Sequence, residues 1–202
     1  VVSEEQLPDD GETPDLLTDP AYRAAVTDLL GVLAYAELIA FERLAYDARM
    51  APSLEDKAAL ARLATAEFGH FQLLDRHLEG LGIEAEKAMA PFVVPLEAFH
   101  AKTAPSDWEE SLVKAYVGDG IAADFYREIA RLLDPQTRAI VLEVLADTGH
   151  AEFAVDRVRQ RIEAEPAIAG RLALWGRRIV GEALAQAQAV CAERDALVAL
   201  LV

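Results

Sequence analysis

The pattern acid-x-x-His occurs twice in this chain, each time inside one of its most apolar segments. Residues 67–70 read EFGH and residues 147–150 read DTGH. Burial of an acid in apolar surroundings is costly, and a glycine inside a helix is about 1 kcal/mol less favourable than alanine. A chain that tolerates both penalties twice needs a fold that brings its buried acids and histidines to a common partner.

Most of the chain has the apolar periodicity of α-helices. Helix starts are marked by a capping residue, a proline or both at Asp19-Pro20, Ser53 with Asp56, Ser106 with Glu109, Asp134-Pro135, and Pro166. They predict long helices over residues 20–50, 53–79, 106–133 and 134–163, and a fifth helix from Pro166 almost to the C-terminus. The sequence shows no sustained polar–apolar alternation, so we expect an all-α protein.

The connections between these helices predict their topology. Short breaks join the first helix to the second and the third to the fourth, whereas residues 83–106 form a long, proline-containing connection with a short crossover helix. Two hairpins joined in this way form a four-helix bundle with one long crossover. Residues 1–19 are acidic and predict a flexible arm, and residues 20–202 predict one helical domain. The apolar residues of the fifth helix predict packing on the bundle or a homodimer interface; they are Leu172, Trp175, Ile179, Leu184 and Val190.

Acids interrupt the apolar stripe of each bundle helix near the same level. Residues equidistant from the turn of an antiparallel hairpin lie at the same height, and these acids fall within about two helical turns of one another. The candidate metal ligands are Glu37, Glu67, His70, Asp119, Asp147 and His150. Glu42 is a rival of Glu37 because it also lies on an apolar stripe, but it is closer to the turn.

Carboxylates and imidazoles gathered in a dry core need a positive partner between them. One acid from each of two helices, with acid-x-x-His from each of the other two, is the ligand set of di-iron and di-manganese carboxylate proteins. Mixed carboxylate and imidazole ligation suits iron or manganese, so we expect two Fe ions, or Mn, as cofactors. Gly69 and Gly149 are expected to relieve crowding beside this centre. His77 and His100 are predicted to be ordinary histidines without a ligand role.

The stretches AEFGHF, AYVGDGIAADFYREIA and VLADTGHAEFAVDRV resemble the ferritin-like superfamily, and in particular its MiaE-like branch, named for a bacterial tRNA hydroxylase. The resemblance covers residues 20–197 and implies a ferritin-like bundle whose di-iron centre activates oxygen. It implies that Glu37, Glu67, His70 and His150 are metal ligands. Two positions depart from that family: Asp147 replaces a glutamate, and the glutamate of the third helix falls at Ala122, with Asp119 one turn earlier.

These departures leave three interpretations open: an altered dinuclear site, a mononuclear site and a structural relic. Asp119 is alternatively an acid that orients a histidine rather than a metal ligand. The resemblance implies a hydroxylase or oxidase that acts on an organic substrate. The alternative is a non-catalytic ferritin-like binding or interaction protein with a degenerate metal site.

The charge of the chain argues against nucleic acid as a partner. Lys and Arg number 19 against 35 Asp and Glu, a formal net charge of −16, which disfavours binding to tRNA and to anionic membranes. The basic residues that gather locally are Arg157, Arg161, Arg171 and Arg178, and we expect them to pair with Glu163, Glu165 and Glu182. We therefore expect a soluble, cytoplasmic protein with a small or apolar substrate. Cys191 is the only cysteine, so no intrachain disulfide forms.

Overall fold

The computed structural model describes residues 16–146 and 150–200, with only the backbone of His150. The described residues form helices and no strand, as predicted. The α-helices are α1 (Pro20–Asp47), α2 (Leu54–Gly80), α3 (Ala85–Lys102), α4 (Trp108–Ala130), α5 (Pro135–Val144), α6 (His150–Ala164), α7 (Ala169–Glu193) and α8 (Asp195–Val198). Three short 3-10 helices accompany them: η1 (Leu16–Thr18), η2 (Ala48–Met50) and η3 (Pro166–Ile168).

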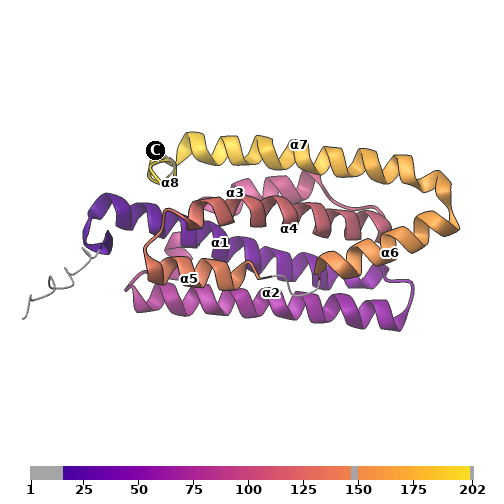
Figure 1. Ribbon diagram of the computed structural model, residues 1–202, viewed down its shortest axis with the longest axis horizontal. Coiled ribbons are helices and arrows are strands. Elements are labelled where there is room, and N and C mark those ends of the chain that lie inside the picture. Colours follow the sequence, from indigo (N-terminus) through magenta and orange to yellow (C-terminus); the bar gives the residue numbers. More distant parts are fainter. Residues whose placement is uncertain (1–15, 147–149, 201–202) are drawn as a thin grey trace, which may run out of the picture.

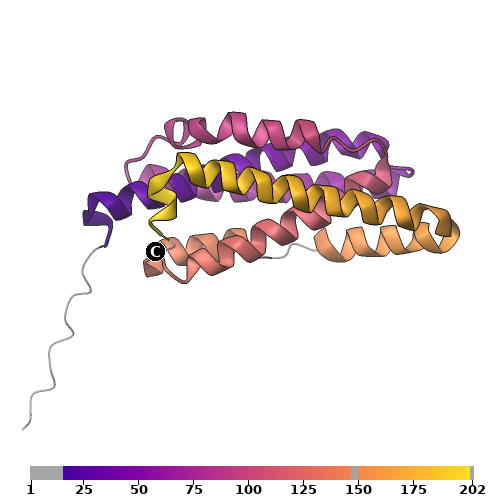
Figure 2. The same cartoon turned by 90° about the horizontal axis from the view of Figure 1, so that it is seen from above.

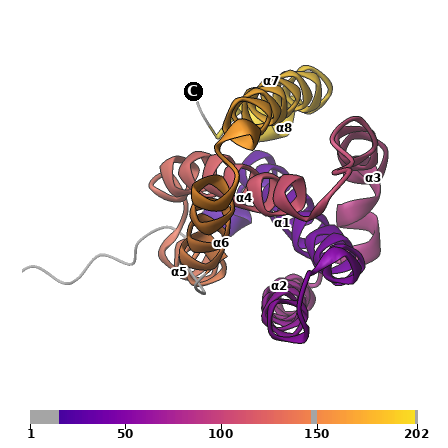
Figure 3. The same ribbon diagram turned by 90° about the vertical axis from the view of Figure 1, so that its right-hand side faces the viewer.

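The helices form the predicted bundle with a long crossover and an additional C-terminal helix. Helices α1 and α2 form one antiparallel hairpin, and α4 forms the second with α5 and α6, which follow one another along the bundle (Figure 1). Helix α3 connects the hairpins and packs along α1. Viewed end-on, α7 lies on the side of the molecule opposite α2, with α1 and α4 between them (Figure 3).

Helix α1 is the central element of the core. Its residues Val26, Leu29, Leu30 and Leu33 are at most 1% exposed. Burial of each such side chain contributes about 1.5–3 kcal/mol of stability. The stretch Pro20–Met50 is also long and apolar enough to span a membrane, but more than half of its most apolar window is buried inside the protein. Both properties are expected of a helix that neighbours cover on several sides.

Side-chain caps confirm most of the predicted helix starts. The carboxylate of Asp19 accepts a hydrogen bond from the amide of Ala21 at 2.8 Å, and Ser53 Oγ accepts one from the amide of Asp56 at 3.0 Å. The predicted start at Ser106 is wrong by one residue. Asp107 has the extended backbone of a cap and accepts from the amide of Glu110 at 2.9 Å.

The prediction of one continuous helix over residues 134–163 is wrong. Helix α5 ends at Val144, and Leu145 leaves the helical conformation with φ −84° and ψ 6°. The carbonyl oxygen of Leu145 instead accepts a hydrogen bond from Nη2 of Arg127 at 3.3 Å. The apolar stripe continues past Val144, so hydrophobic periodicity alone did not reveal the end of the helix.

The crossover helix is longer than predicted. Helix α3 has 18 residues and contains Pro91 and Pro95. A proline inside a helix removes a backbone hydrogen bond and costs about 3 kcal/mol. Burial of Phe92, which is 1% exposed, offsets part of this penalty. Propensity therefore predicted a shorter helix than packing produces.

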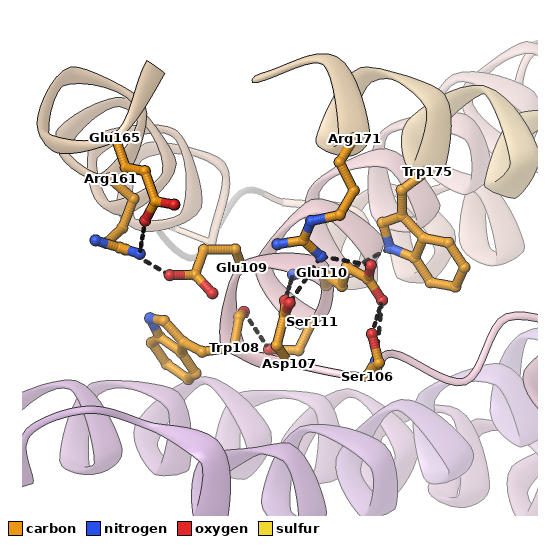
Figure 4. A network of polar contacts seen from close by, with 10 residues as sticks. All are labelled: Ser106, Asp107, Trp108, Glu109, Glu110, Ser111, Arg161, Glu165, Arg171 and Trp175. Carbon is orange, nitrogen blue, oxygen red and sulfur yellow. Dashed lines mark hydrogen bonds and ion pairs between the residues drawn. The ribbon is translucent and has the colours of Figure 1, made fainter. Parts of the chain in front are cut away.

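The last long helix packs on the bundle through polar and apolar contacts. Leu172, Trp175 and Ile179 are buried, whereas Leu184 is exposed. Figure 4 shows the polar part of this contact, at the N-terminus of α4. Trp175 Nε1 donates a hydrogen bond to the carbonyl oxygen of Glu110 at 2.9 Å, and Arg171 pairs with the Glu110 carboxylate at 2.6 Å.

We expect Gly31→Ala to destabilise the protein by about 1–3 kcal/mol, as overpacking of a core does. A Cβ at Gly31 would lie 2.2 Å from the carbonyl oxygen of Ala88, so α1 and α3 would have to separate. The free energy of unfolding in urea measures this. Gly181→Ala is the matched control, because its Cβ meets no atom within 4 Å; this variant should be more stable by up to about 1 kcal/mol. Equal stability of the two variants would contradict the close α1–α3 contact.

Candidate metal centre

Three of the predicted ligands come together between α1 and α2. Glu37 projects from α1, and Glu67 and His70 project from successive turns of α2. One potential ligand atom from each residue lies within 4.8 Å of the other two. Nδ1 of His70 is 3.4 Å from Oε2 of Glu37 and 3.6 Å from Oε2 of Glu67. The antiparallel hairpin and the i, i+3 spacing on α2 produce this arrangement.

The three side chains are shielded from water, which makes their charges costly. Their exposed fractions are 13% for Glu37, 8% for Glu67 and 17% for His70. Burial, and then the neighbouring Glu67 carboxylate, raise the pKa of Glu37 well above its usual value. The adjacent carboxylates of Glu37 and Glu67 raise the pKa of His70 to about 9. Two acids thus compete for the positive charge of one imidazolium.

The residues present fit a divalent cation. Oε2 of Glu37 is buried and has no hydrogen-bond partner among the described residues. Two carboxylates and one imidazole supply oxygen and nitrogen ligands of the kinds that iron and manganese accept. A divalent cation beside these atoms would replace the proton on His70 and satisfy the oxygen of Glu37. This half of the predicted site therefore supplies three ligand atoms of kinds that one metal ion can accept.

A cavity of about 540 Å³ adjoins these ligands. Glu37, Glu67 and His70 line it from α1 and α2, and Asp119 and Ala122 line it from α4. Asp119 is exposed, so it lies at the cavity without sharing the burial of the other three ligands. Most of the remaining lining is apolar and small: Ala36, Ala40, Val117, Ile121, Ala123, Val144 and Ala151.

The remaining predicted ligands belong to the second hairpin. Asp147 and Gly149 lie outside the described residues, and α6 begins at His150, whose side chain is likewise outside them. The rival ligand Glu42 is exposed. Gly69 is also exposed, and a Cβ there would meet no described atom within 4 Å, so the predicted steric role of this glycine is wrong.

Sequence reasoning missed the position of Arg127. Asp124 and Arg127 are exposed and both line the cavity, and Arg127 also bonds the backbone where α5 ends. Oδ1 of Asp124 lies 3.4 Å from Nη1 of Arg127. Helical periodicity carried no signal for this role, because it depends on the end of another helix.

We expect the metal-free protein to lose stability as the pH rises from about 6.5 through 9. The folded-state pKa of His70 is raised to about 9, so the stabilisation is complete below the unfolded pKa of about 6.5 and disappears above 9. The raised pKa of Glu37 changes stability in the same direction. The slope contributed by His70 alone cannot exceed about 1.4 kcal/mol per pH unit. Urea unfolding at several pH values measures it.

His70→Gln should flatten this pH dependence. His77→Gln on the same helix is the control, because burial lowers the pKa of His77, so its contribution has the opposite sign and fades above the unfolded pKa of about 6.5. A slope as steep in His70→Gln as in the parent protein would contradict protonation of His70 by its acidic neighbours.

Comparisons with known proteins agree with this architecture. A protein from Synechococcus described as "Protein 19 with aldehyde deformylating oxidase activity" has a similar structure, with a TM-score of 0.72 and 22% sequence identity. The similarity covers 90% of this chain and 83% of that one, and it shows a common fold. A comparison with curated proteins finds no match. Residues 20–202 match the family described as "Ferritin-like domain, actinomycetes", and the chain belongs to that family.

Proposed function

We propose that this protein binds iron or manganese at Glu37, Glu67 and His70 and uses it in an oxygen-dependent oxidation of a small apolar molecule. The observation that carries the proposal is the convergence of ligand atoms from one buried and two half-buried residues within 4.8 Å beside a cavity. Bound there, iron or manganese would supply the oxygen chemistry that the side chains lack. Completion of a dinuclear centre would require Asp147, His150 and an acid on α4.

The side chains around the ligands support binding of an organic substrate. Small apolar residues of α1 and α4 form much of the cavity wall, and a cavity of about 540 Å³ lies within the usual range for small-molecule sites. Glu37 and Glu67 would orient the metal, and His70 would exchange its proton for the metal. The small apolar residues of the lining would contact an apolar substrate. The Synechococcus protein of similar fold has an oxidase activity by its description, which is consistent with this proposal.

One observation favours a second candidate function. Ala122 lines the cavity where the resemblance to the tRNA hydroxylase branch places a glutamate, and the nearest acid, Asp119, is exposed. A centre whose acid on α4 is the exposed Asp119, in place of a glutamate at position 122, would hold one metal, or none. In that case the cavity would serve a non-catalytic binding protein. Metal binding and turnover therefore have to be measured separately.

We expect protein supplied anaerobically with ferrous iron to retain about one to two metal ions per chain. Glu67→Ala and His70→Ala should each lower this content at least tenfold, as loss of a ligand does (about 1.4 kcal/mol or more). Elemental analysis after desalting measures it. Glu79→Ala is the control, because Glu79 lies exposed on the same helix and should leave the content unchanged.

Less than about 0.2 metal ions per chain in the parent protein would refute the metal site. Oxygen uptake in the presence of a reductant then separates the two functions. If the protein binds metal but shows no oxygen uptake that depends on Glu67 and His70, the result supports the non-catalytic function.

We also propose that tRNA is not a partner, although the sequence resembles a tRNA hydroxylase. Binding to phosphate backbones requires free Lys and Arg side chains. Arg157 pairs with Asp56 at 2.6 Å, and Arg161 pairs with Glu109 at 2.5 Å. Of the three acids expected as partners, Glu165 does pair with Arg161, at 3.2 Å, but most partners are acids at the starts of α2 and α4.

At about 0.15 M salt we expect tRNA to bind with a Kd above 1 µM. The double variant Arg157→Glu/Arg178→Glu should change this affinity little, because both side chains already have partners. A fluorescence titration with unmodified tRNA measures this. Submicromolar, salt-sensitive binding that the double variant abolishes would contradict the proposal.

A further inference from the structure

A second group of buried and half-buried polar side chains lies where α1, α3 and α4 meet. Helix α1 supplies Arg43 and Asp47, α3 supplies His100, and α4 supplies Lys114. Arg43 and Asp47 lie six and ten residues after Glu37, about 9 and 15 Å farther along the helix axis. Asp47 is only 7% exposed and Lys114 only 8%. This cluster is therefore separate from the candidate metal centre.

Polar atoms of this cluster lack partners. Nε of Arg43 and Nδ1 of His100 are buried and have no hydrogen-bond partner among the described residues. The described contact of the Lys114 ammonium is with a ring face, 5.7 Å from the centroid of Phe99. A buried polar group without a partner costs about 1–3 kcal/mol, and native proteins usually satisfy such groups with water or a ligand.

The local charge distribution selects the kind of ligand. Burial, followed by the positive charges of Lys114 and Arg43, lowers the pKa of His100 to about 3, so the imidazole is neutral and lies in a positive potential. Burial lowers the pKa of Lys114 to about 8 despite the opposing charge of Asp47. A ligand with negative charge and acceptor oxygens would relieve both effects. Asp47 limits the affinity for an anion, and burial raises its pKa to about 6.

We propose that Arg43, His100 and Lys114 form a binding site for a small oxyanion, a carboxylate of the size of formate or acetate. Nε–H of Arg43, the Nδ1–H tautomer of His100 and the Lys114 ammonium would donate to its oxygens. The opposite side of Arg43 is already held, because its Nη2 pairs with Glu97 at 2.8 Å. That pair is 41% and 44% exposed, so this side of Arg43 reaches solvent.

The direct test is titration of metal-free protein with ¹³C-formate, followed by the broadening of the formate resonance and by backbone amide shifts. We expect a Kd of about 1–10 mM, with shifts concentrated around residues 97–102 and 112–116. Lys114→Met should weaken binding at least about tenfold, which corresponds to about 1.4 kcal/mol. Lys87→Met is the matched control: this lysine is 76% exposed, and its loss should leave binding unchanged. Sodium chloride at equal ionic strength controls for screening.

Unchanged binding in Lys114→Met, or no binding at about 50 mM formate, would overturn the proposal. If Lys114→Met does not fold, amide shifts in the parent protein decide, and shifts that avoid these segments would overturn it equally. Glu67→Ala should bind formate like the parent protein. Loss of the metal centre and loss of the anion site are therefore observed separately.

Discussion

Helix α1 has to fill the core and carry charged groups on two of its faces. Apolar residues from Val26 to Leu33 anchor one part of it, and beyond them the helix presents Glu37 to α2 and Arg43 and Asp47 toward α3 and α4. Charges at these depths remain tolerable only when neighbouring helices supply partners for them. The positions of α2, α3 and α4 around α1 follow from this requirement as much as from hydrophobic burial. Figure 2, a view of the molecule from above, shows that these helices run alongside one another.

The sequence predicted the hairpin of α1 and α2 and the meeting of Glu37, Glu67 and His70 within it. That prediction depended on two regular quantities, the helical rise and the distance of each residue from a turn. The end of α5 at Val144 and the full length of α3 were not predictable in this way. Both depend on contacts between elements, namely the bond from Arg127 to Leu145 and the packing of Phe92 on the core.

The cluster of Arg43, Asp47, His100 and Lys114 was missed for a similar reason. His100 was predicted to have no ligand role, and nothing in its own segment relates it to an arginine on α1 or a lysine on α4. Elsewhere along the same pair of helices, Gly31 lets the backbone of α3 at Ala88 come close to α1. A pattern within one helix records which of its faces is buried, but not which charges the neighbouring helices bring to that face.

The burial of α1 also has a consequence for synthesis. Val190, Leu197 and Leu200 belong to the same core cluster as Val26 and Leu30, and Arg194 pairs with Asp28. Part of α1 is therefore covered by residues that are translated long after it. At 5–20 residues per second, the apolar surface of α1 waits roughly 8–30 s for those residues. A nascent chain that pauses near the start of α7 would present this surface to chaperones, because complete burial of α1 depends on residues that follow α7.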